Sequence, residues 1–168
     1  DNLAQRIHAR GAMDPVLARR VLRDVADALA YAHTQRVIHR DIKPDNILLD
    51  AVSGRPMVTD FGIARAISEG ADARLTATGI AIGTPAYMSP EQSAGDKEID
   101  GRSDLYSLGV VAYQMLAGEL PFVASSTPAM LVKHLSERPT PLQFKRAGVP
   151  ADLAAAVMCL LEKDPADR

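Results

Sequence analysis

The most informative part of this 168-residue chain is the stretch His39-Arg40-Asp41-Ile42-Lys43-Pro44-Asp45-Asn46. It brings a carboxylate, an ammonium group and an amide close together in a short loop-like run. Fourteen residues after Asn46 stands Asp60-Phe61-Gly62, and about thirty residues further on stands Ser89-Pro90-Glu91. Each motif alone is short enough to occur by chance, so the information lies in their order and spacing.

Length and composition describe one globular domain. Hydrophobic residues make up 47% of the chain and charged residues 24%, which suits a sizeable core. The net charge of -2 provides no basic field for nucleic acid or anionic membrane. No apolar run reaches the roughly 18 residues that a membrane helix needs. We therefore expect no nucleic-acid partner and no membrane contact by this segment.

The chain has a single cysteine, Cys159, which excludes an internal disulfide. It lies in an apolar run, so we expect a buried structural thiol. The lack of a disulfide framework suits a reducing compartment. We therefore expect a cytoplasmic location and leave open a membrane anchor elsewhere in a longer parent protein.

Hydrophobic periodicity predicts a mainly α chain, α+β overall. Asp14 and Pro15 are suited to the N-cap and first position of a helix, and apolar residues follow at helical spacing through about residue 34. The segment 103–116 is apolar nearly all round, which is typical of a core helix. Further helices are expected over residues 3–8, 128–137 and 151–162.

Two short apolar runs, 47–49 and 57–59, flank Ser53-Gly54 and predict a small antiparallel hairpin. In the simplest register Leu49 faces Met57, and Asn46 then faces Asp60. This would bring an amide oxygen and a carboxylate to one end of the ribbon, where a hard cation could bind both.

Together the three motifs resemble the catalytic core of eukaryotic-type (Hanks-type) bacterial serine/threonine protein kinases. The resemblance covers essentially all 168 residues and implies a kinase-like C-terminal lobe, helical with a small hairpin. In the family, a glycine-rich loop and a lysine strand lie upstream of these motifs, and this chain shows neither. We therefore expect residues 1–168 to be a C-lobe only, truncated at both ends, and inactive by itself.

The resemblance implies transfer of the ATP γ-phosphoryl group to serine or threonine hydroxyls of proteins, with Mg²⁺. It assigns Asp41 to the substrate hydroxyl proton and Lys43 to the transferring phosphoryl group. Asn46 and Asp60 would hold the metal, and with Lys43 they would contact the nucleotide.

Two features imply a serine/threonine rather than a tyrosine kinase. Loops that read Asp-x-Lys-x-x-Asn, as here from Asp41 to Asn46, resemble those of serine/threonine kinases. Thr84, within the run 83–91, matches the family threonine that bridges the catalytic aspartate and lysine. Thr84 is therefore expected to be part of the catalytic set.

The segment between Gly62 and Gly83 resembles an activation segment. The placement of Thr76 and Thr78 is similar to that of the paired threonines that bacterial members autophosphorylate. A phosphate there adds nearly two negative charges, which could order the segment against a cation. Arg40 is the expected cation, with Arg65 and Arg74 as weaker candidates. Dimerisation for phosphorylation in trans is left open.

Several residues resemble the family's architectural positions. Glu91 would pair with Arg168 in a buried ion pair, and Asp104 would hydrogen-bond the catalytic-loop backbone. The remaining histidines show no metal-ligand spacing and are expected on helix surfaces or in packing. The full set with expected structural roles is His39, Arg40, Phe61, Gly62, Glu91, Asp104 and Arg168.

Two alternatives belong to other functional classes. A truncated pseudokinase would bind partners without transferring phosphate, but it would have no physical need for all four of Asp41, Lys43, Asn46 and Asp60. A phosphotransferase acting on a small molecule such as an aminoglycoside would share the fold. The segment 83–91 disfavours it, because that peptide-positioning element is typical of protein kinases.

Overall fold

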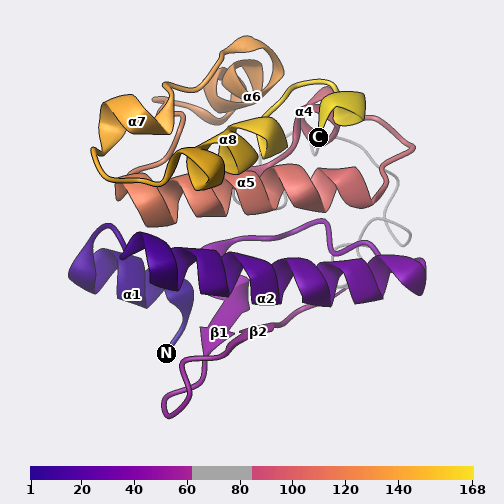
Figure 1. Cartoon of the computed structure of the whole chain (residues 1–168). Helices are drawn as coiled ribbons and strands as arrows, with labels where there is room; N and C mark the ends of the chain where they lie inside the picture. The colour runs from indigo at the N-terminus through magenta and orange to yellow at the C-terminus, as the bar shows by residue number, and fades with distance from the viewer. Residues whose placement is uncertain (62–84) are drawn as a thin grey trace.

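Two long helices, α2 (Pro15–Thr34) and α5 (Gly101–Ala117), lie side by side through the middle of the molecule (Figure 1). The computed structural model describes residues 1–61 and 85–168. On the α2 side lie the N-terminal helix and the hairpin, and on the α5 side lie the C-terminal helices (Figure 1). The other helices are α1 (Leu3–Arg10), α4 (Pro90–Ala94), α6 (Thr127–Ser136), α7 (Leu142–Lys145) and α8 (Ala151–Leu160).

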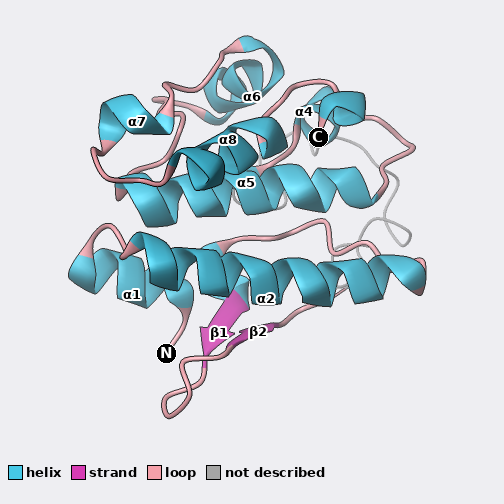
Figure 2. Cartoon of the chain, viewed as in Figure 1, coloured by secondary structure: helices cyan, strands magenta, loops and turns pink. Residues whose placement is uncertain are grey.

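Strand content is small, as Figure 2 shows. The strands β1 (Ile47–Leu49) and β2 (Pro56–Val58) form one antiparallel pair. Three single 3₁₀ turns complete the described elements: η1 (Pro44–Asn46), η2 (Pro85–Tyr87) and η3 (Pro165–Asp167). The prediction of a mainly α chain with a small hairpin is confirmed. No helix in the described ranges is long and apolar enough to cross a bilayer.

Helix α2 begins where the sequence predicts. The Asp14 carboxylate accepts hydrogen bonds from the N–H groups of Val16 and Leu17, at 3.0 and 3.3 Å. Pro15 occupies the first helical position, where a missing N–H is harmless. Five residues of one helical face are buried against the core: Ala18, Val21, Val25, Leu29 and Ala32.

Helix α5 is the core of the molecule, and most of its residues are buried. It approaches α8 so closely at Gly109 that a Cβ there would lie 2.8 Å from the Leu160 Cβ. Any larger residue at position 109 would force the two helices apart. The sequence-based expectation of a core helix is confirmed, because no wide polar face is left for solvent.

The hairpin forms, but the register predicted from the sequence is wrong by one residue. Leu49 pairs with Pro56, not with Met57. The reason is the connecting turn: the Asp50 carboxylate accepts from the N–H groups of Val52 and Ser53, at 3.2 and 2.7 Å. The loop 50–55 has an even number of residues and is closed by a hydrogen bond from the Asp50 N–H to the Arg55 carbonyl at 3.0 Å. Every pair of the hairpin is therefore shifted by one position relative to the predicted register.

The expectation that Cys159 is buried is also wrong, because its side chain is exposed. Helix α8 buries Leu153, Ala154 and Val157, and the next buried position is Leu161. Cys159 lies two residues after Val157 and therefore on the opposite face of the helix. Its thiol donates a weak hydrogen bond to the Asp167 carbonyl at 3.3 Å.

Candidate active site

The loop that precedes β1 is anchored from helix α5 by the carboxylate of Asp104, which is 1% exposed. One oxygen accepts from the Arg40 N–H at 2.8 Å and the other from the His39 N–H at 2.9 Å. Asp104 thus satisfies two neighbouring backbone donors that would otherwise be buried without partners. The loop is held at residues 39 and 40, immediately before Asp41.

The second Asp104 oxygen also contacts a residue whose role the sequence did not reveal. His33, near the end of α2, places its Nε2 2.8 Å from Asp104 Oδ2. A Cβ at Gly101 would lie 2.6 Å from the His33 ring, so the first residue of α5 must be glycine-sized. His33 lies six residues before His39, and no metal-ligand or catalytic spacing marks it.

His39 packs beneath the loop and is 1% exposed. Its Nε2 lies 2.7 Å from the Thr59 carbonyl, and its Nδ1 accepts from the Asp41 N–H at 3.3 Å. These two partners require a neutral ring with the proton on Nε2. The Phe61 ring lies 4.7 Å from the His39 ring, centroid to centroid. The histidine therefore connects the loop before β1 to the segment after β2.

Asp41, Lys43 and Asn46 meet in one cluster. Asp41 Oδ2 accepts from Lys43 Nζ at 2.7 Å and from Asn46 Nδ2 at 3.1 Å. The same Asn46 amide donates to the Asp41 carbonyl at 2.8 Å. No hydrogen bond to the other carboxylate oxygen, Asp41 Oδ1, is present among the described residues. The Asp41 side chain is 34% exposed, so solvent and ligands can reach it.

Asp60 lies next to this cluster along the hairpin, although it does not pair with Asn46. Thr59 N–H donates to the Asn46 carbonyl at 2.9 Å, so Asp60 follows the last paired residue. Both Asn46 and Asp60 therefore remain at the same end of the ribbon. Asp60 adopts φ 63° and Arg40 adopts φ 66°, which is uncommon for residues other than glycine. Such backbone strain is concentrated at functional sites.

The residues present fit the coordination chemistry of magnesium bound with a nucleotide. The Asn46 Nδ2 donates hydrogen bonds to Asp41, which leaves the Asn46 Oδ1 for a different ligand. Asp60 supplies an exposed carboxylate. Within residues 1–61 and 85–168 no group of three or more His, Cys, Asp or Glu could form a protein-only metal cage. Mg²⁺ commonly takes only one or two protein oxygens and completes its shell with phosphates and water.

Some predicted site residues lie outside the described ranges. These are Gly62, Thr76, Thr78 and Thr84. The described chain resumes at η2, from which the Tyr87 carbonyl accepts a hydrogen bond from the Ser107 hydroxyl at 2.8 Å. The Tyr87 hydroxyl donates to Gln114 at 2.7 Å, and burial raises the pKa of Tyr87 to about 12. The segment that follows 62–84 is thus tied to α5 at Tyr87.

Helix α4 makes two connections that bear on the site. Glu91 forms a two-pronged ion pair with Arg168, with N–O distances of 2.8 and 3.0 Å. The Gln92 side chain donates from Nε2 to the Arg40 carbonyl at 2.7 Å. The sequence motif draws attention to Glu91, whereas nothing in the sequence singles out the glutamine beside it.

The Arg168 guanidinium belongs to a largely buried group that we call the C-terminal corner: Glu91, Tyr106, His134, Lys163 and Arg168. His134 Nδ1 lies 3.0 Å from the Tyr106 hydroxyl, which also accepts from Lys163 Nζ at 3.2 Å. Burial, reinforced by the Lys163 charge, lowers the pKa of His134 to about 4. Burial and the Arg168 charge lower the pKa of Lys163 to about 8.

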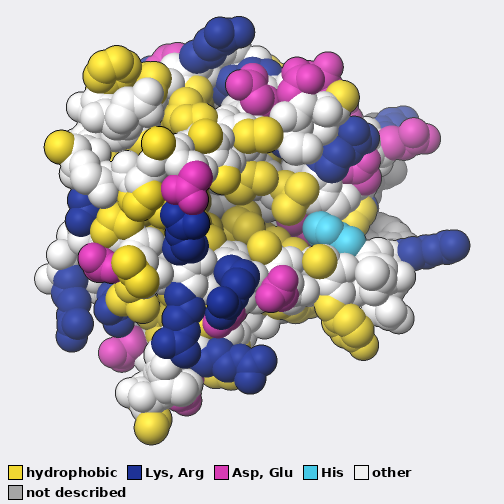
Figure 3. Space-filling view, viewed as in Figure 1, with side chains coloured by type: hydrophobic (Ala, Val, Ile, Leu, Met, Phe, Trp, Pro, Cys, Tyr) yellow, Lys and Arg dark blue, Asp and Glu magenta, His cyan; other side chains and the backbone are white. Residues whose placement is uncertain are grey.

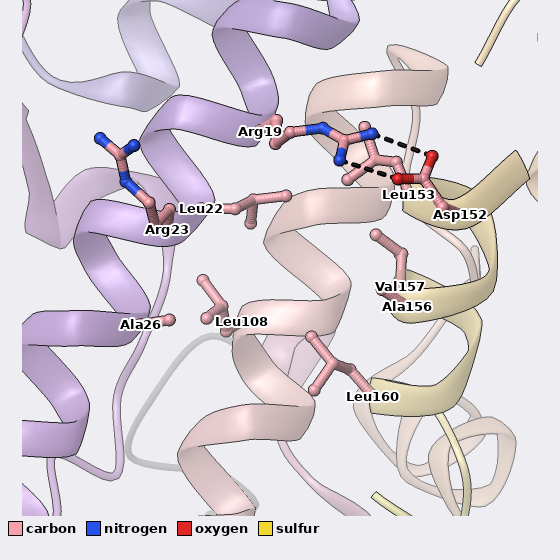
Figure 4. A pocket seen from close by; sticks show the side chains of 10 residues that line it. All are labelled: Arg19, Leu22, Arg23, Ala26, Leu108, Asp152, Leu153, Ala156, Val157 and Leu160. Carbon is pink, nitrogen blue, oxygen red and sulfur yellow. Dashed lines mark hydrogen bonds and ion pairs between the residues drawn. The ribbon is translucent and has the colours of Figure 1, made fainter. Parts of the chain in front are cut away.

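A separate groove of about 320 Å³ lies between α2, α5 and α8 (Figure 4). Its floor is apolar and includes Leu22 and Leu108. Arg19 and Asp152 form a two-pronged ion pair at one end (Figure 4). On this face basic side chains gather over α2, next to apolar surface over α5 and α8 (Figure 3). The groove contains none of the predicted site residues.

Comparison with known proteins gives a consistent result. Residues 1–168 match the family model described as the protein kinase domain. The serine/threonine-protein kinase PknB of Mycobacterium tuberculosis is 43% identical over 162 residues, covering 96% of this chain and 25% of that protein. PknB of Mycobacterium leprae is 42% identical with the same coverage. The serine/threonine-protein kinase Pkn1 of Myxococcus xanthus is 46% identical over 153 residues, covering 88% of this chain and 21% of that protein. The chain thus spans about a quarter of the length of the curated relatives it matches.

Proposed function

The chain belongs to the protein kinase family, and from that premise we propose that it is part of a serine/threonine protein kinase. This enzyme would transfer the γ-phosphoryl group of ATP to protein hydroxyls. Residues 1–168 would form the C-terminal lobe of the kinase domain and carry its catalytic loop. The named serine/threonine kinases among its relatives support the substrate class.

One observation carries this proposal: the arrangement around the Asp41 carboxylate. Both Lys43 and Asn46 donate to the same oxygen, Oδ2. The carboxylate is thereby fixed in orientation, while Oδ1 remains available within the described structure for a substrate hydroxyl. A carboxylate held in this way can orient the attacking oxygen and accept its proton as the bond to phosphorus forms.

Lys43 and Asn46 would each have two tasks. The Lys43 ammonium lies 2.7 Å from Asp41 and would place positive charge beside the transferring phosphoryl group, where negative charge accumulates. Asn46 holds Asp41 through Nδ2 and would offer Oδ1 to the metal. Asp60 would be the second metal ligand, and Mg²⁺, when bound, would supply charge neutralisation at the phosphates.

The remaining assignments rest on the family resemblance. We infer that Thr84 bridges Asp41 and Lys43 and that Thr76 and Thr78 are regulatory phosphosites. Proteins with serine or threonine hydroxyls would be the substrates, and dimerisation would serve phosphorylation in trans. Because the proposed activity would consume ATP, we infer a cytoplasmic location for it.

The test is phosphoryl transfer by the full-length protein with labelled ATP, Mg²⁺ and dephosphorylated casein as acceptor. We expect phosphoserine and phosphothreonine in the acceptor, and we expect Asp41→Asn to lower kcat by about 10²–10⁴-fold. Asp96→Asn changes an exposed carboxylate outside the motif 39–46 and should leave kcat unchanged. Retention of full activity by Asp41→Asn, or the absence of transfer by the wild type, would contradict the proposal.

A further inference from the structure

The peptide group between Arg40 and Asp41 is the last piece of backbone before the catalytic carboxylate. Its N–H, from Asp41, donates to His39 Nδ1 at 3.3 Å. Its carbonyl, from Arg40, accepts from Gln92 Nε2 at 2.7 Å. The orientation of this peptide plane is therefore determined by one side chain of the loop itself and by one side chain from helix α4.

The backbone at this point needs such restraint. Arg40 adopts φ 66°, a left-handed conformation that is strained for a residue with a Cβ. Asp104 holds the Arg40 N–H, and Gln92 holds the Arg40 carbonyl. Removal of the Gln92 donor would leave the carbonyl side free to rotate toward a less strained arrangement, and the Asp41 side chain would turn with it.

The Gln92 amide is itself fixed in orientation. Its Oε1 accepts from the Ser89 N–H at 3.0 Å, and the Ser89 hydroxyl accepts from the Gln92 N–H at 3.2 Å. These two bonds form the capping box of α4. The Ser89 hydroxyl also lies 2.7 Å from the Ser103 hydroxyl on α5, and Ser89 is fully buried. A flipped amide would place an oxygen against the Arg40 carbonyl, so the contacts define which atom donates.

We propose that Gln92 is a positioning residue that orients the Asp41 carboxylate by holding the Arg40 carbonyl. This inference rests on the proposed kinase function and adds a residue to it. It also gives a physical route from α4, which begins six residues after the segment 62–84, to the catalytic loop. A displacement of α4 would be transmitted to Asp41 through one amide.

The chain contains a matched control for this claim. Helix α1 has a second capping box, in which Gln5 Oε1 accepts from the Asn2 N–H at 3.1 Å and Asn2 Oδ1 accepts from the Gln5 N–H at 2.8 Å. Gln5 is exposed, and within the described residues its amide nitrogen donates to no catalytic-loop group. The same substitution at both positions therefore tests the donor bond separately from the cap.

The decisive variant is Gln92→Glu in the full-length protein. Glutamate keeps the capping box but removes the donor and places a carboxylate oxygen against the Arg40 carbonyl. We expect kcat to fall about tenfold to a hundredfold, as slight misplacement of a catalytic group does. The KM for ATP should stay within about twofold, because a positioning role affects the transition state rather than binding. Gln5→Glu should leave both parameters unchanged.

A third variant, Gln92→Lys, keeps a donor for the Arg40 carbonyl but loses the acceptor for Ser89. It should have a lower Tm than Gln92→Glu and a higher kcat. The inference would be overturned if Gln92→Glu had the same kcat as the wild type. It would also be overturned if the variant at position 92 with the lower Tm also had the lower kcat. Should Gln92→Glu fail to fold, the kcat of Gln92→Lys decides alone, and a loss of about tenfold or more counts against the inference. Transfer by the wild type that Asp41→Asn lowers by about 10²-fold or more would leave the proposed function standing in any of these cases.

Discussion

The C-terminal corner and the groove between α2 and α8 contain arginine–carboxylate pairs of nearly the same geometry in very different surroundings. Arg168 meets Glu91 at 2.8 and 3.0 Å, and Arg19 meets Asp152 at 2.8 and 2.9 Å. The side chains of the first pair are 0% and 10% exposed, whereas those of the second are 50% and 68% exposed. The distances are equivalent, so the two pairs differ in their surroundings and not in the geometry of the ion pair itself.

The buried arginine differs from the exposed one in having further partners besides its carboxylate. Arg168 also donates to the carbonyls of Glu162 and Lys163, at 2.8 and 2.9 Å, and lies 4.9 Å above the Tyr106 ring. Its guanidinium thus joins α4, α5 and the C-terminal segment. A buried charge that loses its partner keeps its desolvation penalty, whereas an exposed charge is hydrated again.

The largest expected effect is therefore at Arg168. Arg168→Ala should lower the free energy of unfolding by about 3–5 kcal/mol, because the Glu91 carboxylate stays buried without a counter-charge. Urea unfolding of wild type and variant, followed by circular dichroism, measures this loss. Glu91→Gln combined with Arg168→Met should recover part of it, since that pair removes both charges. A loss below about 1 kcal/mol in Arg168→Ala would show that burial does not separate the two pairs.

The contact between Glu91 and Arg168 lies where the sequence resemblance suggests, although 77 residues separate the two in the chain. Asp14 and Pro15 correctly predicted the start of α2, because helix capping depends only on adjacent residues. The helices of the core followed from periodicity. Patterns that use near neighbours or a familiar motif could therefore be interpreted from the sequence alone.

What the sequence could not provide depends on atoms brought together by the fold. The hairpin register was wrong because the Asp50 carboxylate selects a loop that apolar patterning does not reveal. Cys159 lies in an apolar run but on the outer face of α8. The contacts of His33 with Asp104 and of Gln92 with Arg40 join residues separated by 71 and 52 positions. No local pattern marks either pair.

The stability of the C-terminal corner should depend on pH through His134. The pKa of His134 is lowered to about 4, chiefly by burial, from an ordinary value of 6.5. Between these values the unfolded chain binds a proton that the folded chain does not, so stability falls as pH decreases from about 6.5 to 4. The contribution amounts to about 3 kcal/mol at most.

His134→Gln isolates this contribution, because the other groups that titrate in the same window remain. Unfolding free energies measured from pH 7 to pH 4 should decrease more steeply for the wild type than for the variant. Above pH 7 the difference between the two proteins should be constant, since the imidazole is neutral in both states. Parallel profiles of unfolding free energy below pH 6.5 would mean that burial in the C-terminal corner does not lower the pKa of His134.

The smallest effect is expected at the groove. Arg19→Ala should lower the free energy of unfolding by less than about 1 kcal/mol, because Asp152 is hydrated again once its partner is removed. A double-mutant cycle with Asp152→Ala measures the coupling between the two side chains. That coupling should shrink further in 1 M salt, where charges at the surface are screened over about 3 Å. The coupling of Glu91 and Arg168 should respond much less to salt, because the guanidinium is shielded from solvent. Equal salt sensitivity at both sites would place the Arg168 pair in contact with water, and burial would then not distinguish the two pairs.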